Sequence, residues 1–154
     1  VQLLMRRPIP AAVRFLLAAS GAFLLAPQVE GQEKARYQVI VHAANPVSSL
    51  TRDQLSRFFL KKTTAWENGR TVAPADLFEA SPVRVAFSRD IHRRSVAAIK
   101  SYWQQRIFSG SDVPPPEFAT DSDIVAYVRA RPGAIAYVSA GAESAGVKAV
   151  EARE

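Results

Sequence analysis

The sequence predicts a single α/β domain with a mixed sheet flanked by helices, and three observations lead to that expectation. The chain has 154 residues, which is room for one domain. Hydrophobic residues make up 48% and charged residues 22% of the chain, as in ordinary globular proteins. Strand-like and helix-like segments alternate, with no internal repeat or long linker. Because this order is typical of α/β folds, we expect parallel pairs in the middle of the sheet.

The strands are recognised from their apolar, β-branched composition. Residues 37–43 and 134–138 are runs that are almost entirely apolar, typical of strands covered on both faces. Residues 71–77 form a short extended run, which Pro74 restricts to the edge of a sheet because proline cannot donate to a ladder. A last strand is expected over 147–150.

The helices are recognised from their first residues. Serine or threonine, the preferred N-caps, precedes each predicted helix, at Thr51, Ser81, Ser95 and Thr120. The helix that begins at Ser95 ends before Gly110. Its apolar stripe is predicted to consist of Val96, Ile99, Trp103 and Ile107.

The first 31 residues have the layout of a secretory signal peptide. Met5 is followed by two arginines, and the uncharged apolar stretch 15–26 is far shorter than the roughly 20 residues needed to span a bilayer. Small or branched residues up to Gly31 suit a cleavage site. We therefore predict a signal peptide over 1–31 and a domain over 32–154 that is periplasmic or secreted, and soluble after cleavage.

Composition disfavours most enzyme classes that have a readable sequence signature. The chain has no cysteine and only two histidines, so disulfides, thiolate metal sites and a cysteine nucleophile are excluded. No pair of carboxylates, no nucleophile beside a base and no glycine-rich phosphate loop stands out. We predict no catalysis, no cofactor and no metal. The formal charge of +6 falls to +4 when the predicted signal peptide leaves with three arginines and one glutamate. That excess suits a small anion better than nucleic acid.

The helix start at Ser81 is the candidate binding site. A helix N-terminus offers unpaired N–H groups and a partial positive charge, which together attract anions. Ser81 would add its hydroxyl, Val83 its backbone N–H, and Arg84 its N–H and its guanidinium. Pro82 removes one donor. The alternative is plain capping, in which the Ser81 hydroxyl only accepts the Arg84 N–H.

Other polar and aromatic groups are interpreted as structural. The basic loop 61–64 follows a helix end, and the cationic group of Arg89, His92, Arg93 and Arg94 reads as a solvated helix face. Asp121 and Asp123 lie in a first helical turn, where capping explains them. The remaining groups are expected in the core, and these are His42, Trp66, Tyr102 and Trp103.

Three motifs in order carry a resemblance to a known family. They are LTRDQLSRFFLKKTTAWENG (50–69), SPVRVAF (81–87) and RPGAIAYV (131–138). The chain resembles periplasmic phosphate-binding proteins, and is most similar to short single-domain relatives in the type II periplasmic-binding superfamily. The resemblance implies one binding-protein-like lobe that holds phosphate or a related oxyanion without covalent chemistry and serves the membrane subunits of an ABC transporter. It also assigns Ser81 as a hydroxyl and helix-start donor.

The departures from that family predict weak, less selective binding. Pro82 and Val83 stand where the family has Gly-Thr, and Ala136 replaces a glycine. Only the predicted signal peptide precedes Tyr37, whereas the full-length proteins have an earlier region that supplies half of the phosphate contacts. Glu79 is the nearest candidate to accept the ligand's own proton. The alternative function is a ligand-free domain that acts as an envelope interaction or sensory protein. An extracytoplasmic hydrolase lacks a catalytic constellation, and the oligomeric state is left open.

Overall fold

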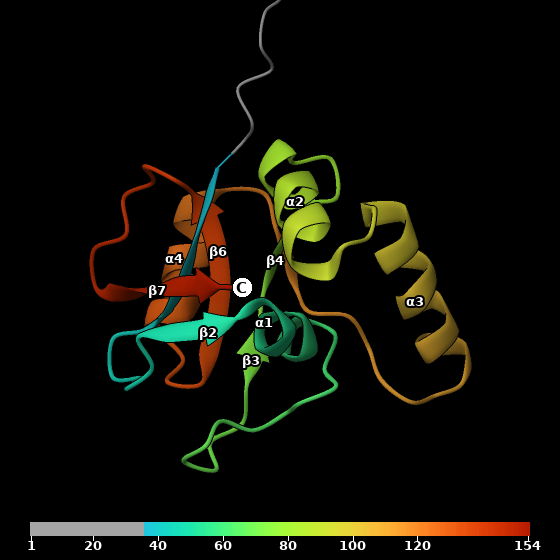
Figure 1. The fold of residues 1–154 in the computed structure, drawn as a ribbon, viewed down its shortest axis with the longest axis horizontal. Helices are drawn as coiled ribbons and strands as arrows, with labels where there is room; N and C mark the ends of the chain where they lie inside the picture. Colours follow the sequence, from blue (N-terminus) through green and yellow to red (C-terminus); the bar gives the residue numbers. More distant parts are fainter. Residues whose placement is uncertain (1–35) are drawn as a thin grey trace, which may run out of the picture. The chain divides into compact units, whose positions relative to one another are not determined.

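Strands and helices alternate in the computed structural model, which describes residues 36–154 (Figure 1). The strands are β1 (Tyr37–His42), β2 (Ser49–Thr51), β3 (Ala73–Pro74), β4 (Asp76–Leu77), β5 (Glu117–Phe118), β6 (Ala134–Ser139) and β7 (Val147–Arg153). The helices are α1 (Arg52–Phe59), α2 (Pro82–Phe87), the π-helix η1 (Ser88–His92), α3 (Val96–Phe108) and α4 (Asp121–Arg129). The predicted signal peptide, residues 1–31, lies outside the described residues.

Five strands form one mixed sheet in the order β2-β7-β1-β6-β3, and β4 pairs with β5 in a second, parallel sheet. The predicted α/β class with a mixed sheet is therefore confirmed. The expected parallel centre is wrong: β1 is antiparallel to both β6 and β7, and the parallel pairs β2–β7 and β3–β6 lie at the edges. The expectation assumed that successive strands are neighbours, whereas β1 lies between two strands from the other end of the described chain. Pro74 is in an edge strand, as predicted.

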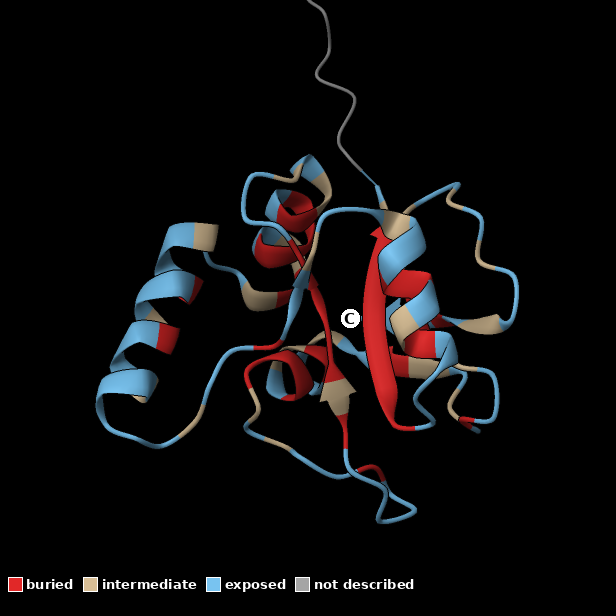
Figure 2. Cartoon of the chain, turned by 180° about the vertical axis from the view of Figure 1, so that it is seen from behind, coloured by how far each residue is buried: buried red, intermediate tan, exposed pale blue. Residues whose placement is uncertain are grey.

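The core lies on both sides of β6, which is buried from Ala134 to Val138 (Figure 2). On one side, the Tyr137 ring packs against Phe59 of α1 and Phe87 of α2. On the other, α4 contributes its apolar stripe, which consists of Ile124, Val125 and Val128. Burial on both faces explains why the strand sequence is a continuous apolar run.

The N-caps of the helices were predicted correctly. Thr51 accepts from the N–H of Gln54 at 3.2 Å and the Gln54 side chain accepts from the N–H of Thr51 at 2.9 Å, which completes a capping box. Ser95 and Thr120 cap α3 and α4 at 3.1 and 3.2 Å. These local bonds fix where each helix begins.

The helix α3 differs from its prediction because it packs beside the sheet and not on it. Only Ile99 and Trp103 of the expected stripe are buried, in a small cluster with Leu60, whereas Ile107 is 52% exposed. Most of α3 is exposed in Figure 2. Within residues 36–154, no helix is long and apolar enough to cross a membrane.

Candidate functional site

The helix start at Ser81 forms as predicted, but its cap is loose. A turn closed by the Ser81 N–H on the Phe78 carbonyl at 2.9 Å leads from β4 into α2. The Ser81 hydroxyl accepts from the N–H of Arg84 at 3.5 Å, against 3.1–3.2 Å at the other three caps. Since 3.5 Å is at the limit of a hydrogen bond, this N–H is weakly satisfied. The N–H of Val83 is among the donors that a first helical turn leaves without an intrahelical partner.

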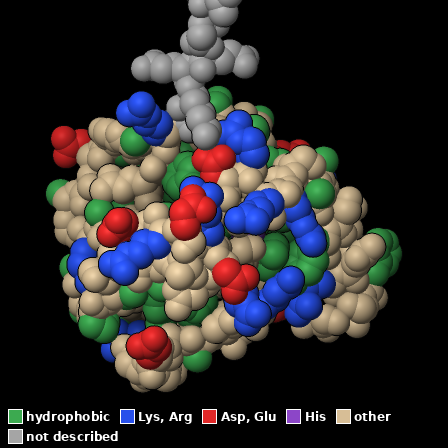
Figure 3. All heavy atoms as spheres, viewed as in Figure 1, with side chains coloured by type: hydrophobic (Ala, Val, Ile, Leu, Met, Phe, Trp, Pro, Cys, Tyr) green, Lys and Arg blue, Asp and Glu red, His purple; other side chains and the backbone are tan. Residues whose placement is uncertain are grey.

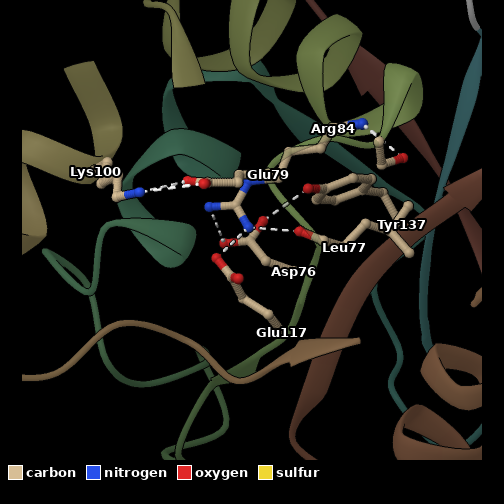
Figure 4. Close-up of polar contacts among 8 residues, drawn as sticks. Asp76, Leu77, Glu79, Arg84, Lys100, Glu117 and Tyr137 are labelled. Carbon is tan, nitrogen blue, oxygen red and sulfur yellow. Dashed lines mark hydrogen bonds and ion pairs between the residues drawn. The ribbon is translucent and has the colours of Figure 1, made fainter. Parts of the chain in front are cut away.

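The Arg84 guanidinium is held inside the protein by acceptors that the sequence interpretation did not include. Arg84 is 4% exposed. Its Nη1 donates to the Leu77 carbonyl at 2.5 Å and to Glu117 Oε1 at 2.6 Å, and its Nη2 lies 3.7 Å from Asp76 Oδ2 (Figure 4). The side chain therefore pairs with the β4–β5 sheet. The Ser81 hydroxyl instead contacts the backbone N–H of Arg84.

Tyr137 completes this group, which we call the Arg84 network and define as Arg84, Asp76, Glu117 and Tyr137; all of them except the exposed Glu117 are buried. The Tyr137 hydroxyl donates to Asp76 Oδ1 at 2.7 Å. Burial raises the pKa of Asp76 above its ordinary value, although Arg84 and the Tyr137 hydrogen bond oppose the change. Burial also raises the pKa of Tyr137, and Asp76 adds to the effect.

Arg84 stays protonated in the network, and the neighbouring carboxylates offset its positive charge. Burial by itself would lower the pKa of Arg84, but Asp76 first, and then Tyr137 and Glu117, raise it above its ordinary value. With both carboxylates ionised, the network carries one positive and two negative charges. An incoming anion would therefore meet a local excess of negative charge unless a carboxylate is protonated or moves away.

A cavity of about 480 Å³ opens beside the network, between the end of β4, α3 and residues 114–117. Arg84 and Glu117 line it, together with Glu79 and Lys100. Glu79, the predicted acceptor for a ligand's proton, forms a half-exposed ion pair with Lys100 at 3.0 Å (Figure 4). The charged groups nearest to Arg84 are thus already paired with one another.

The prediction that His92 belongs to a solvated cationic helix face is wrong. Arg89, Arg93 and Arg94 are exposed, but the His92 ring packs on Phe59 and Phe87, and its Nδ1 lies 2.9 Å from the Ser56 hydroxyl. Burial, helped by nearby positive charges led by Arg84, lowers the pKa of His92 to about 4. The imidazole is therefore neutral at physiological pH.

Most of the groups interpreted as structural have internal partners. The Trp66 indole donates to the Gly133 carbonyl at 2.9 Å, and Asp121 accepts from the N–H of Ser139 at 3.1 Å. Lys61, in the basic loop, pairs with Asp112. Acidic and basic side chains are interspersed over the face drawn in Figure 3, with basic ones gathered around a hydrophobic hollow. Among the described residues, no group of three or more His, Asp or Glu side chains could hold a metal.

The fold matches part of each of several solved receptor and substrate-binding proteins, which confirms the resemblance at the level of fold. The chain is similar to an ABC-type phosphate transport receptor from Vibrio cholerae, with 21% identity, a TM-score of 0.61, and coverage of 77% of this chain and 46% of the receptor. It is also similar to a putative phosphate ABC transporter substrate-binding protein with bound phosphate from Clostridium perfringens, with 20% identity, a TM-score of 0.61, and coverage of 77% and 45%.

A third similar structure is a possible phosphate binding protein from Planctomyces limnophilus, with 16% identity, a TM-score of 0.58, and coverage of 78% of this chain and 42% of that protein. The chain thus spans less than half the length of each of these three solved structures. Neither a protein-family model nor a curated relative matches the sequence.

Proposed function

We propose that this chain is an exported, non-catalytic solute-binding domain that takes phosphate or a related oxyanion at the start of α2. The observation that carries the proposal is the loosely capped helix start at Ser81, in a fold shared with receptors that are named for phosphate. Periplasmic location, release of residues 1–31 and service to an ABC transporter belong to the same proposal.

In this proposal the backbone carries most of the recognition. The Ser81 hydroxyl and the N–H groups of Val83 and Arg84 would donate to the oxyanion, as helix N-termini do for phosphate. The Arg84 guanidinium would act from within the network, because its Nη1 already donates to Leu77 and Glu117. Since that network sets two carboxylates against one guanidinium, the expected affinity is weak and the selectivity between oxyanions is low.

Thermal unfolding with phosphate, with sulfate and with chloride tests this function. A ligand present at 100 times its dissociation constant stabilises the folded state by about 2.7 kcal/mol, which is several degrees for a domain of this size. A rise with phosphate supports the proposal, and an equal rise with sulfate indicates a general oxyanion site. No rise with any anion, up to tens of millimolar, contradicts it.

A pair of serine variants separates binding from helix capping. Both Ser81 and Ser95 are N-caps, so Ser81→Ala and Ser95→Ala each lose a cap, at a cost of about 1 kcal/mol in stability. Only Ser81→Ala should also lose the stabilisation by phosphate. If both variants keep it, the anion binds elsewhere.

The second candidate function is an interaction or sensory domain of the cell envelope without an anion ligand. The observation that favours it is the pairing of Arg84 with Glu117 and Asp76, which leaves no net positive charge near the helix start. This candidate predicts no response to phosphate and the recovery of a specific partner from envelope membranes by the immobilised protein. A phosphate response that is lost in Ser81→Ala decides against it.

A further inference from the structure

A cavity lined in part by aromatic side chains lies away from α2. It is a cavity of about 490 Å³ between residues 45–50, α1 and residues 63–68, and it shares no lining residue with the cavity beside Arg84. Its apolar lining includes Val47, Leu50, Phe58 and Trp66. The Phe58 and Trp66 rings lie 4.7 Å apart with 50° between their planes, and both are largely buried.

Three carboxamides line this cavity, and all three are held in the same way. Asn45 Oδ1 accepts from the N–H of Val47 at 3.0 Å. Gln54 Oε1 accepts from the N–H of Thr51 at 2.9 Å, and Asn68 Oδ1 from the N–H of Arg70 at 3.1 Å. Each oxygen is thus fixed by the backbone, and within residues 36–154 none of the three NH₂ groups has a hydrogen-bond partner. The cavity is therefore lined by donors that remain available.

Asn45 is the most informative of the three because it is only 6% exposed. Its N–H donates to the His42 carbonyl at 2.9 Å, and its own carbonyl accepts from the Lys148 ammonium. With its Oδ1 bonded as well, Nδ2 is its only polar atom without a protein partner among the described residues. This Nδ2 is not fully buried, so it reaches the open space of the cavity, where an acceptor atom of a ligand can replace water.

The charges around the cavity argue against an anion. Asp53 and Arg57 neutralise each other in an i,i+4 ion pair at 2.9 Å. Glu67 is the other ionisable side chain among the lining residues, so the lining carries one net negative charge. Apolar walls, amide donors and a weakly negative rim fit an uncharged molecule that offers acceptor atoms.

We propose that this carboxamide cavity binds a neutral small molecule with a flat apolar body and a carbonyl acceptor, such as an amide, lactam or ketone. The flat body would pack against Phe58 and Trp66, and the carbonyl would accept from Asn45 Nδ2. The site goes beyond the oxyanion function and does not depend on it.

The test uses N,N-dimethylbenzamide as the probe, because it is neutral, carries a flat phenyl ring and accepts hydrogen bonds without donating any. Isopropylbenzene has a similar shape without the carbonyl, and benzoate adds a negative charge. Titrations of the ¹⁵N-labelled protein are followed through the side-chain signals of Asn45, Gln54 and Trp66. We expect a saturable shift of the Asn45 NH₂ and Trp66 indole signals by the amide at millimolar concentration, with benzoate and the hydrocarbon binding at least about tenfold more weakly.

Two substitutions replace a donor with an acceptor while keeping the structural bond. Asn45→Asp retains the oxygen that accepts from Val47, and Gln54→Glu retains the capping box at Thr51. We expect Asn45→Asp to weaken binding of the amide by about tenfold or more. Gln54→Glu, which also adds a negative charge, should weaken it too. Gln104→Glu is the matched control, because it makes the same change in the other cavity and should have no effect.

The proposal is overturned if the amide gives no saturable shift, if isopropylbenzene binds equally well, or if both acidic variants bind as the unchanged protein does. Should Asn45→Asp not fold, as judged by thermal unfolding, Gln54→Glu decides alone. Phosphate added to the same samples should leave these signals in place. Failure of the oxyanion function and failure of this cavity are therefore observed separately.

Discussion

The ring of Phe87 in α2 lies flat against the ring of Tyr137 in β6, with centroids 3.8 Å apart and 9° between the planes. The hydroxyl of the same tyrosine donates to Asp76, which is in turn an ion-pair partner of Arg84. One side chain thus joins the apolar core to the buried charges, and helix α2 is fixed at the sheet through both ends of Tyr137.

Removing the Tyr137 hydroxyl should destabilise the fold without opening a cavity. In Tyr137→Phe the stacked ring remains, but Asp76 Oδ1 loses its buried donor, which we expect to cost about 1–3 kcal/mol. Urea unfolding measures the change. Tyr127→Phe is the control, because that hydroxyl makes no hydrogen bond within residues 36–154, and its cost should be near zero. Equal costs for the two variants would show that the bond to Asp76 contributes nothing.

Removing the Arg84 guanidinium should be far more damaging than removing a neighbouring exposed one. Arg84→Met leaves Asp76 and Glu117 without their buried cation, and we expect a loss of about 3–5 kcal/mol in unfolding free energy. Arg89→Met, which removes an exposed arginine paired with Asp90, should cost about 0.5 kcal/mol or less. Adding Asp76→Asn and Glu117→Gln to Arg84→Met should recover part of the loss. A larger loss in the triple variant would contradict this account.

His92 should make the stability of the protein depend on pH. Its pKa of about 4 in the folded state lies below the ordinary 6.5, so the unfolded chain binds the proton more readily between these values. The contribution of His92 to the free energy of unfolding is therefore fully present above pH 6.5. It is lost as the pH drops toward 4, which lowers the free energy of unfolding by up to about 3 kcal/mol. Urea unfolding at a series of pH values measures this slope.

The contribution of His92 is isolated by comparing the two histidines of the chain. In His92→Asn the pH slope between about 6.5 and 4 should be shallower than in the unchanged protein. His42→Asn, which changes the histidine at the end of β1, should retain the full slope. A slope that is the same in all three proteins would assign the pH dependence to other groups.

Gly133 should not tolerate a side chain, because a Cβ at this position would lie 2.0 Å from the Thr71 carbonyl oxygen. The backbone there is fixed, since the Gly133 carbonyl also accepts from the Trp66 indole. Gly133→Ala should therefore cost at least about 2–3 kcal/mol, measured by urea unfolding. Gly69→Ala has open space but a φ of +79°, so its cost should be only about 1 kcal/mol. A harmless Gly133→Ala would mean that the two backbones separate easily.

Local structure was predictable because its causes are local. The caps at Thr51 and Ser95 depend on residues within one helical turn. Pro74 has no N–H to donate to a neighbouring strand, so its presence predicts an edge strand. The continuous apolar run of β6 indicates burial on both faces without knowledge of its neighbours.

The order of the sheet and the state of Arg84 were not predictable in this way, because their causes are distant in sequence. The helix-start pattern at Ser81 predicted a cap correctly, but it contained no information on Glu117, which takes up the Arg84 side chain from another strand. The one available signal was Asp76, an acid inside an extended, mostly apolar run, since such a residue needs a buried partner. The exposure of Ile107 likewise depends on where α3 packs, and not on its own periodicity.

The position of β1 between β6 and β7 has a consequence for the order of events in synthesis. Val39 lies opposite Tyr137 on one side and Val150 on the other, so β1 leaves the ribosome long before either neighbour exists. Contacts this distant in sequence make folding slow and expose unpaired strand edges until the late strands arrive. A premature stop after α4 would remove both neighbours of β1 together, and the product would be a chain without the five-stranded sheet instead of a smaller folded domain.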